Sequence, residues 1–308
     1  MSKSSVSRRV SCPALFLFIA SITMANVFAK PADAAEQGRA ECRSLPSKIL
    51  GHPVAYCAVL PTGYDVDKTT QYPVLYFLHG LGGNEQVLLE SGGMSEIQDL
   101  RAANKIGQFL VVAPNAGRSF YINSRDGRVR YEDFFIKEFM PYIESHYRIR
   151  ADRNDRGITG VSMGGYGALR FGLKYPELFG SVSAHSAALI ERLPRFEGSD
   201  DQSSGIARIL GGSFGNPVDP KYWERESPFT IVRTSSKPAD LPIYFDCGTD
   251  DDFGFNVGAQ KFHELLVSRG IPHEFHLYPG GHDMDYFSEH LPASLEFHSR
   301  VFAKGTRK

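Results

Sequence analysis

The sequence predicts an α/β protein with a mostly parallel central sheet and helices on both faces. Two observations lead to this class. Apolar runs of strand length alternate along the chain with segments of helical periodicity. Several of those runs are apolar throughout, which is typical of strands buried on both faces. With 308 residues and 42% hydrophobic content, the chain can bury a large core as one α/β domain or two.

The strands and helices are predicted in order from these patterns. The expected strands cover residues 56–61, 72–78, 108–113, 157–159, 179–184, 242–248 and 273–278. The expected helices cover residues 94–104, 131–147, 163–173, 256–269 and 285–302. The apolar stripe of 131–147 is interpreted as core packing rather than as a ligand site. No repeat, low-complexity tract or clear linker divides the chain.

Residues 1–29 have the pattern of a secretory signal peptide. A positive segment with Lys3, Arg8 and Arg9 precedes an apolar run at 10–20, and the small residues Val27 and Ala29 suit a cleavage site. A second candidate cleavage site lies at residues 34–35. The alternative is an uncleaved membrane anchor, but the apolar run is short for a membrane span. We therefore expect a secreted or periplasmic protein with no stable membrane anchor after cleavage.

Export permits disulfides, and Cys42 and Cys57 are placed to form one. Each lies in a predicted strand, and the midpoint between them falls at the turn 50–53 of a hairpin. A disulfide closing such a loop would contribute on the order of 3 kcal/mol. Two reduced cysteines in paired strands would give the same pattern. Cys12 is lost with the signal peptide, and Cys247 is expected to be a buried thiol.

A nucleophile elbow is indicated by the sequence GVSMG at 160–164, which fits G-x-S-x-G. A β-prone run precedes it and a helical pattern follows it. The motif needs this strand–turn–helix context because a sharp turn strains the backbone of Ser162 and lifts its hydroxyl clear of the sheet. Gly160 and Gly164 would relieve the crowding on either side. The pentapeptide alone could also match by chance in a Gly/Ser-rich loop.

An acid and a base follow Ser162 in the order that nucleophilic serine catalysis uses. The acid candidates after the 242–248 strand are Asp250, Asp251 and Asp252, and Asp251 fits the G-x-x-D spacing from Gly248. A solvated loop or a calcium site are the alternatives for this cluster. After the last strand, His282 follows two glycines. The other histidines of the mature chain lie in strand or helix patterns or precede the acid.

Two loops and one insertion complete the expected site. The loop at 79–84 follows a buried strand and can direct backbone N–H groups to a reacting oxygen, although it would also serve as a tight turn. The polar loop at 114–127, with Tyr121 and Asn123, is expected along a substrate cleft. The stretch 190–241 is predicted to be an irregular insertion that covers the site as a lid. A disordered excursion is the alternative.

As a set, these motifs resemble the putative-esterase family of α/β hydrolases. The resemblance covers residues 40–303 and rests on LHGLGGN (78–84), YEDFFI (131–136), GVSMGGYGAL (160–169), CGTDD (247–251) and YPGGH (278–282). It implies the α/β-hydrolase fold, with Ser162 as nucleophile, Asp251 as acid and His282 as base. It also implies an oxyanion hole formed by the backbone N–H groups of Leu81 and Met163, and no cofactor.

The resemblance leads us to expect an exported serine carboxylesterase that acts on a small-molecule or glycan ester. The family includes S-formylglutathione hydrolases, feruloyl and acetylxylan esterases, and mycolyl-transferring proteins, so the substrate stays open. Export argues against the cytosolic formylglutathione role. An acyltransferase with the same triad and a catalytically silent binding protein are the alternatives. The net charge of −1 gives no sign of nucleic-acid binding.

Overall fold

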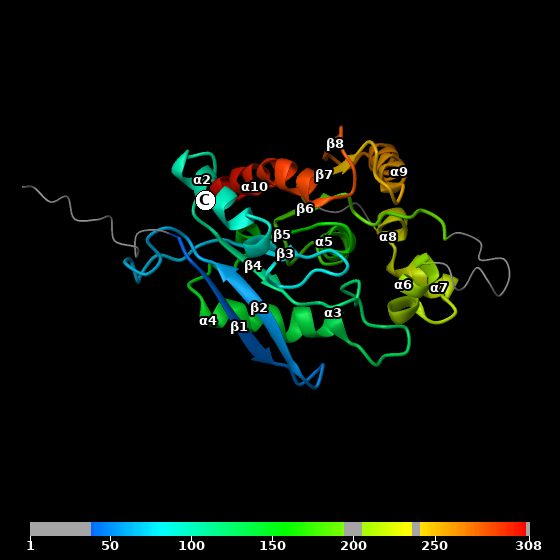
Figure 1. Cartoon of the computed structure of the whole chain (residues 1–308), viewed down its shortest axis with the longest axis horizontal. Helices are drawn as coiled ribbons and strands as arrows, with labels where there is room; N and C mark the ends of the chain where they lie inside the picture. The colour runs from blue at the N-terminus through cyan, green and yellow to red at the C-terminus, as the bar shows by residue number, and fades with distance from the viewer. Residues whose placement is uncertain (1–37, 194–204, 236–240, 306–308) are drawn as a thin grey trace, which may run out of the picture. The chain divides into compact units, whose positions relative to one another are not determined.

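The computed structural model of the protein describes residues 38–193, 205–235 and 241–305, and the predicted signal peptide at 1–29 lies outside them. Residues Ala34–Lys308 form one compact unit. Its centre is an eight-stranded sheet in the order β1-β2-β4-β3-β5-β6-β7-β8 (Figure 1). The strands are β1 (Ala40–Pro46), β2 (Pro53–Val59), β3 (Val74–Leu78), β4 (Leu110–Pro114), β5 (Arg156–Gly160), β6 (Ser181–His185), β7 (Ile243–Gly248) and β8 (Glu274–Tyr278).

The sheet is parallel from β4 to β8 and antiparallel only at β1 and β2. Parallel strands all present their carboxyl ends at one edge, where ligands of open α/β sheets bind. The loops after β3, β5, β7 and β8 therefore meet at the same edge. This arrangement confirms the predicted mostly parallel α/β sheet.

Helices cover both faces of the sheet, as the burial along β3 shows. Leu75 and Phe77 pack into one hydrophobic cluster with residues of α2 (Gly93–Ala102) and α10 (Met284–Gly305). Tyr76 and Leu78 point to the opposite face and pack into a second cluster, which includes α5 (Met163–Lys174) and α9 (Phe255–Ser268). Alternation along a strand that is buried on both faces explains its continuous apolar sequence.

The helix predicted over 131–147 is present but is not uniform. It consists of α3 (Tyr131–Phe134), the π-helical stretch η1 (Phe135–Phe139) and α4 (Met140–His146). Pro141 has no N–H, so it cannot donate to the carbonyl four residues back. The N–H of Met140 instead bonds to the carbonyl of Phe135, five residues back. The wider turn accommodates the proline without ending the helix.

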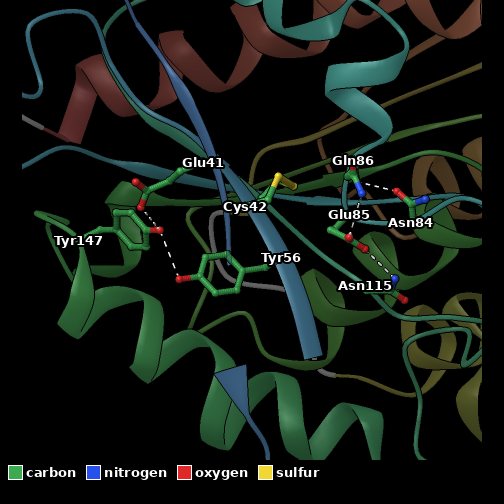
Figure 2. The surroundings of a disulfide bond; sticks show 9 residues. Glu41, Cys42, Tyr56, Asn84, Glu85, Gln86, Asn115 and Tyr147 are labelled. Carbon is green, nitrogen blue, oxygen red and sulfur yellow. Dashed lines mark hydrogen bonds between the residues drawn. A yellow bond between two sulfur atoms is a disulfide. The ribbon is translucent and has the colours of Figure 1, made fainter. Parts of the chain in front are cut away.

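The antiparallel edge of the sheet carries the disulfide (Figure 2). Cys42 of β1 and Cys57 of β2 are directly paired in register, and their sulfur atoms are bonded. Beside them, the Tyr147 hydroxyl donates to Glu41 at 2.7 Å and lies 3.3 Å from the Tyr56 hydroxyl. The structure thus places the two cysteines in the paired strands of the expected hairpin.

The described part of the insertion at 190–241 is mostly helical, which corrects the expectation of irregular structure. It contains α6 (Gly205–Phe214), α7 (Pro220–Glu226) and α8 (Pro228–Thr234). Both short helices begin with proline, and the Asp219 side chain caps α7 by accepting from the N–H groups of Lys221 and Tyr222. An Asp-Pro pair is an N-terminal helix signal that was readable in the sequence.

Candidate active site

Ser162 lies at the turn between β5 and α5, in a strained backbone conformation. Its φ is 55° and its ψ is −117°, a region that residues with a side chain rarely adopt. The turn is crowded, because a Cβ on Gly160 would lie 2.4 Å from the backbone of Gly164. A Cβ on Gly164 would lie 1.9 Å from the carbonyl oxygen of Leu78. Only glycine fits at both positions, as the elbow motif predicts.

The structure brings Ser162, His282 and Asp251 into one hydrogen-bonded chain. The Nε2 atom of His282 lies 2.9 Å from the Ser162 hydroxyl, and its Nδ1 atom lies 2.7 Å from Asp251 Oδ2. Ser162 follows β5, Asp251 follows β7 and His282 follows β8, so all three lie at the carboxyl edge of the sheet. Ser162 and His282 are half-buried, whereas Asp251 is buried. The geometry allows the imidazole to take a proton from the serine while the carboxylate fixes its orientation.

Of the three acid candidates, only Asp251 contacts the imidazole. Asp250 and Asp252 are exposed. Burial opposes ionisation of Asp251, but hydrogen bonds from His282 and from the N–H groups of Phe253 and Phe255 outweigh it. Together they hold the pKa of Asp251 below its usual value, so the acid is a carboxylate at neutral pH.

The thiol of Cys247 also reaches the Asp251 carboxylate. Its sulfur lies 3.5 Å from Oδ2, the oxygen that His282 contacts. Burial first, and the neighbouring carboxylates with it, raise the pKa of this thiol well above its usual value. Cys247 is therefore a neutral donor to the acid and not a reactive thiolate.

The loop after β3 is held rigidly beside the elbow. The buried His79 accepts a hydrogen bond at Nε2 from the N–H of Ala116 at 2.9 Å, and its carbonyl accepts from the Tyr121 hydroxyl at 2.9 Å. At the far end of the loop, the amide of Asn115 donates to Glu85 at 2.7 Å (Figure 2). Leu81, between these anchors, lines the same cavity as Met163 and Ser162.

A mainly apolar cavity of about 170 Å³ opens onto Ser162 and His282. Its other lining side chains come from the loops after β3 and β7, the 114–127 loop, the elbow helix, the segment after β6 and the insertion. They are Leu81, Phe120, Met163, Ala188, Ile190, Ile209, Leu210, Trp223, Phe253 and Phe255. The insertion thus supplies part of the wall through α6 and α7. A larger cavity of about 530 Å³ lies beside the β1–β2 turn, but none of the three triad residues lines it.

The 114–127 loop reaches the cavity through a different residue than expected. Phe120 lines it, whereas Tyr121 is fully buried beneath the loop after β3 and Asn123 bonds to Asp133. Phe120 and Tyr121 both have positive φ, 50° and 58°, so this tight turn sends the two rings in different directions. No sequence pattern marks two consecutive bulky residues for that conformation.

A second Ser–His–Asp arrangement lies inside the core, and no sequence motif indicates it. His185 at the end of β6 contacts Asp246 Oδ2 through Nδ1 at 2.8 Å and the Ser294 hydroxyl through Nε2 at 2.8 Å. All three residues are buried, at 1% exposure or less. The hydroxyls of Tyr244 and Tyr286 also donate to Asp246, each at 2.9 Å.

Among the residues that the structure describes, no three His, Cys, Asp or Glu side chains group as metal ligands. None of the helices in 38–193, 205–235 and 241–305 is both long and apolar enough to cross a membrane.

The sheet order, the elbow and the carboxyl-edge triad define the class: the chain has the α/β-hydrolase fold. A solved ferulic acid esterase supports this with a TM-score of 0.73 and 32% identity, over 86% of this chain and 99% of the other. The family model described as "Putative esterase" matches residues 47–298. The chain belongs to this esterase family.

Curated relatives have similar descriptions. An esterase of Mycobacterium tuberculosis is 32% identical over 244 residues, covering 73% of this chain and 51% of that protein. An acetyl esterase of Caldicellulosiruptor saccharolyticus is 28% identical over 267 residues, covering 83% of this chain and 96% of the relative. The chain thus spans about half the length of the mycobacterial relative and nearly all of the acetyl esterase.

Proposed function

We propose that the protein is a serine carboxylesterase that works through an acyl-enzyme on Ser162. The observation that carries this is the chain Ser162–His282–Asp251, with contacts of 2.9 Å and 2.7 Å, opening onto an apolar cavity. The family membership supports it. Acetyl and ferulic acid esters, named for two relatives, are candidate substrate types.

In the acylation step, His282 takes the proton of Ser162 while the serine oxygen attacks the ester carbonyl carbon. The N–H groups of Leu81 and Met163 stabilise the oxyanion that forms. The intermediate collapses, and His282 gives its proton to the departing alcohol. Asp251, ionised and hydrogen-bonded to Nδ1, stabilises the imidazolium and fixes its tautomer.

In the deacylation step, His282 takes a proton from water as the water attacks the acyl-enzyme. The carboxylic acid leaves and the proton returns to Ser162, so no cofactor or metal is required. We also propose that the protein acts outside the cytoplasm after loss of residues 1–29. The Cys42–Cys57 disulfide supports export, because such bonds persist in oxidising compartments.

Replacement of the nucleophile tests the assignment. Ser162→Ala should lower kcat/KM for p-nitrophenyl acetate at least about 1000-fold, because the oxyanion hole alone leaves only residual catalysis. Ser294→Ala is the matched control, since it removes a serine hydroxyl from the buried His185 arrangement and should keep the activity. Near-wild-type hydrolysis by Ser162→Ala in folded protein would refute the proposal.

A further inference from the structure

The ring of Phe253 is unusual for its position, because it is exposed beside the catalytic imidazole. The residue is 56% exposed, yet it lines the cavity that contains Ser162 and His282. Of the other phenylalanine and tryptophan rings that line the cavity, Phe120 and Trp223 are 4% and 3% exposed, and Phe255 is partly buried. The lining of the cavity therefore includes deeply buried rings, Phe120 and Trp223, and one exposed ring, Phe253.

The position of Phe253 is fixed by the acid itself. Its backbone N–H donates to Asp251 Oδ1 at 3.0 Å. Its ring stacks on Phe255, with centroids 5.5 Å apart and planes at 17°. It also meets the His282 imidazole edge-on, with centroids 4.8 Å apart and planes at 73°. The exposed face of the ring is thus held in place before any ligand arrives, which lowers the entropic cost of binding.

The reaction places the alcohol of the ester on this side. His282 must protonate the departing oxygen, so the alcohol lies against the imidazole at the moment of cleavage. The acyl group can then occupy the buried part of the cavity, which Phe120 and Trp223 line. What remains for the alcohol is the exposed side of the cavity, where Phe253 offers a flat apolar face.

We infer that Phe253 forms the alcohol subsite and selects esters whose alcohol has a flat apolar face, such as a pyranose or aryl ring. This inference rests on the proposed esterase function and adds the class of alcohol to it. Phe253 acts here as a specificity-determining residue. Because leaving and attacking alcohols occupy the same place, the subsite would also bind an acceptor alcohol in acyl transfer.

The test keeps the acyl group constant and varies the alcohol. Methyl acetate, phenyl acetate and a methyl xylopyranoside carrying one acetyl group would be hydrolysed by wild type, Phe253→Ala and Phe253→Tyr. The readout is the ratio of variant to wild-type kcat/KM for each ester, which cancels the intrinsic reactivity of the alcohol. This parameter covers steps up to acylation, where the alcohol is still bound.

We expect Phe253→Ala to lose about 3- to 10-fold more kcat/KM on the ring alcohols than on methyl acetate, as loss of one ring contact implies. Phe253→Tyr should restore the preference. A selective loss on phenyl acetate alone assigns the subsite to aryl alcohols, and one on the xyloside alone to sugars. Val257→Ala is the control, because Val257 is similarly exposed, at 57%, on the adjoining helix and does not line the cavity.

An equal change for all three esters, or none, would overturn the inference, because Phe253 would then act through the triad or not at all. The substitution keeps the backbone N–H that bonds to Asp251, so the acid stays in place. Failure of the proposed function looks different. In that case the wild type would hydrolyse none of the three esters and would not react with a fluorophosphonate probe.

Discussion

Two Ser–His–Asp arrangements lie at neighbouring strands of one sheet, and their hydrogen-bond distances are nearly the same. In one, His282 is 2.7 Å from Asp251 and 2.9 Å from the hydroxyl of Ser162. In the other, His185 is 2.8 Å from both Asp246 and the hydroxyl of Ser294. Distances alone therefore do not distinguish a catalytic triad from a structural one.

The two arrangements differ in the access of solvent and substrate to the serine, in the backbone conformation of the serine, and in the number of other hydrogen bonds to the carboxylate. Ser162 is half-buried on a strained turn and opens onto a cavity, whereas Ser294 is fully buried within α10, where its hydroxyl also donates to the carbonyl of Leu291. The carboxylate of Asp246 accepts two tyrosine hydroxyls in addition to its contact with His185. The buried arrangement satisfies polar groups in the core, which is a stability function.

The acid of each arrangement should therefore affect a different property. Asp251→Asn should lower kcat about 1000- to 10,000-fold, because an amide stabilises the wrong imidazole tautomer and cannot stabilise the imidazolium. Steady-state kinetics on p-nitrophenyl acetate would measure this. The melting temperature should change little, and a loss of less than about 10-fold would contradict the assignment of Asp251 as the acid.

Asp246→Ala should act on stability instead. It leaves the donors of His185, Tyr244 and Tyr286 unsatisfied in the core, which costs about 2–5 kcal/mol in the free energy of unfolding. Urea unfolding followed by circular dichroism would show the change. A variant that remains fully stable would mean that the buried arrangement is not structural, and the comparison would fail.

Acid should weaken the buried region through His298. This fully buried imidazole lies against the hydroxyls of Ser181 and Ser183, and its pKa is lowered to about 3, mainly by burial and also by the nearby His185. The unfolded chain binds a proton near pH 6.5, whereas the folded protein resists it down to about pH 3. Stability from this group is therefore present above pH 6.5 and is lost as the pH falls.

The expected slope is about 1.4 kcal/mol per pH unit between those two values. It would be measured as the wild-type unfolding free energy minus that of His298→Gln, at each pH, because the subtraction cancels the shared carboxylates. A pH-independent difference would show that His298 is not held neutral in the folded state.

The triad could be predicted from the sequence because local signals sufficed for each member. Continuous apolar runs marked the buried strands, glycines marked the elbow of Ser162, and the spacing from Gly248 selected Asp251. In a parallel sheet, residues at strand ends meet whatever their sequence separation. The class of fold and the residues to test can therefore be predicted from the sequence alone.

Other features depend on contacts between distant segments and left no local pattern. His185 and Ser294 are 109 residues apart and join inside the core. The left-handed turn at Phe120 and Tyr121 is maintained by packing against residues such as Tyr166 and Phe214, and by the bond to His79. The helices of the insertion lack a clear sequence pattern for a different reason: the stretch 190–241 is rich in polar residues, and Asp219 and Pro220 mark the start of only one helix.

The most direct test of the difference between the two serines is covalent labelling of the folded protein. The chain would be incubated with a fluorophosphonate and analysed by intact-mass and peptide mass spectrometry. The account predicts one adduct per chain, on the peptide that contains Ser162, with no adduct in Ser162→Ala. An adduct on Ser294, or no adduct on the folded wild-type protein, would contradict it.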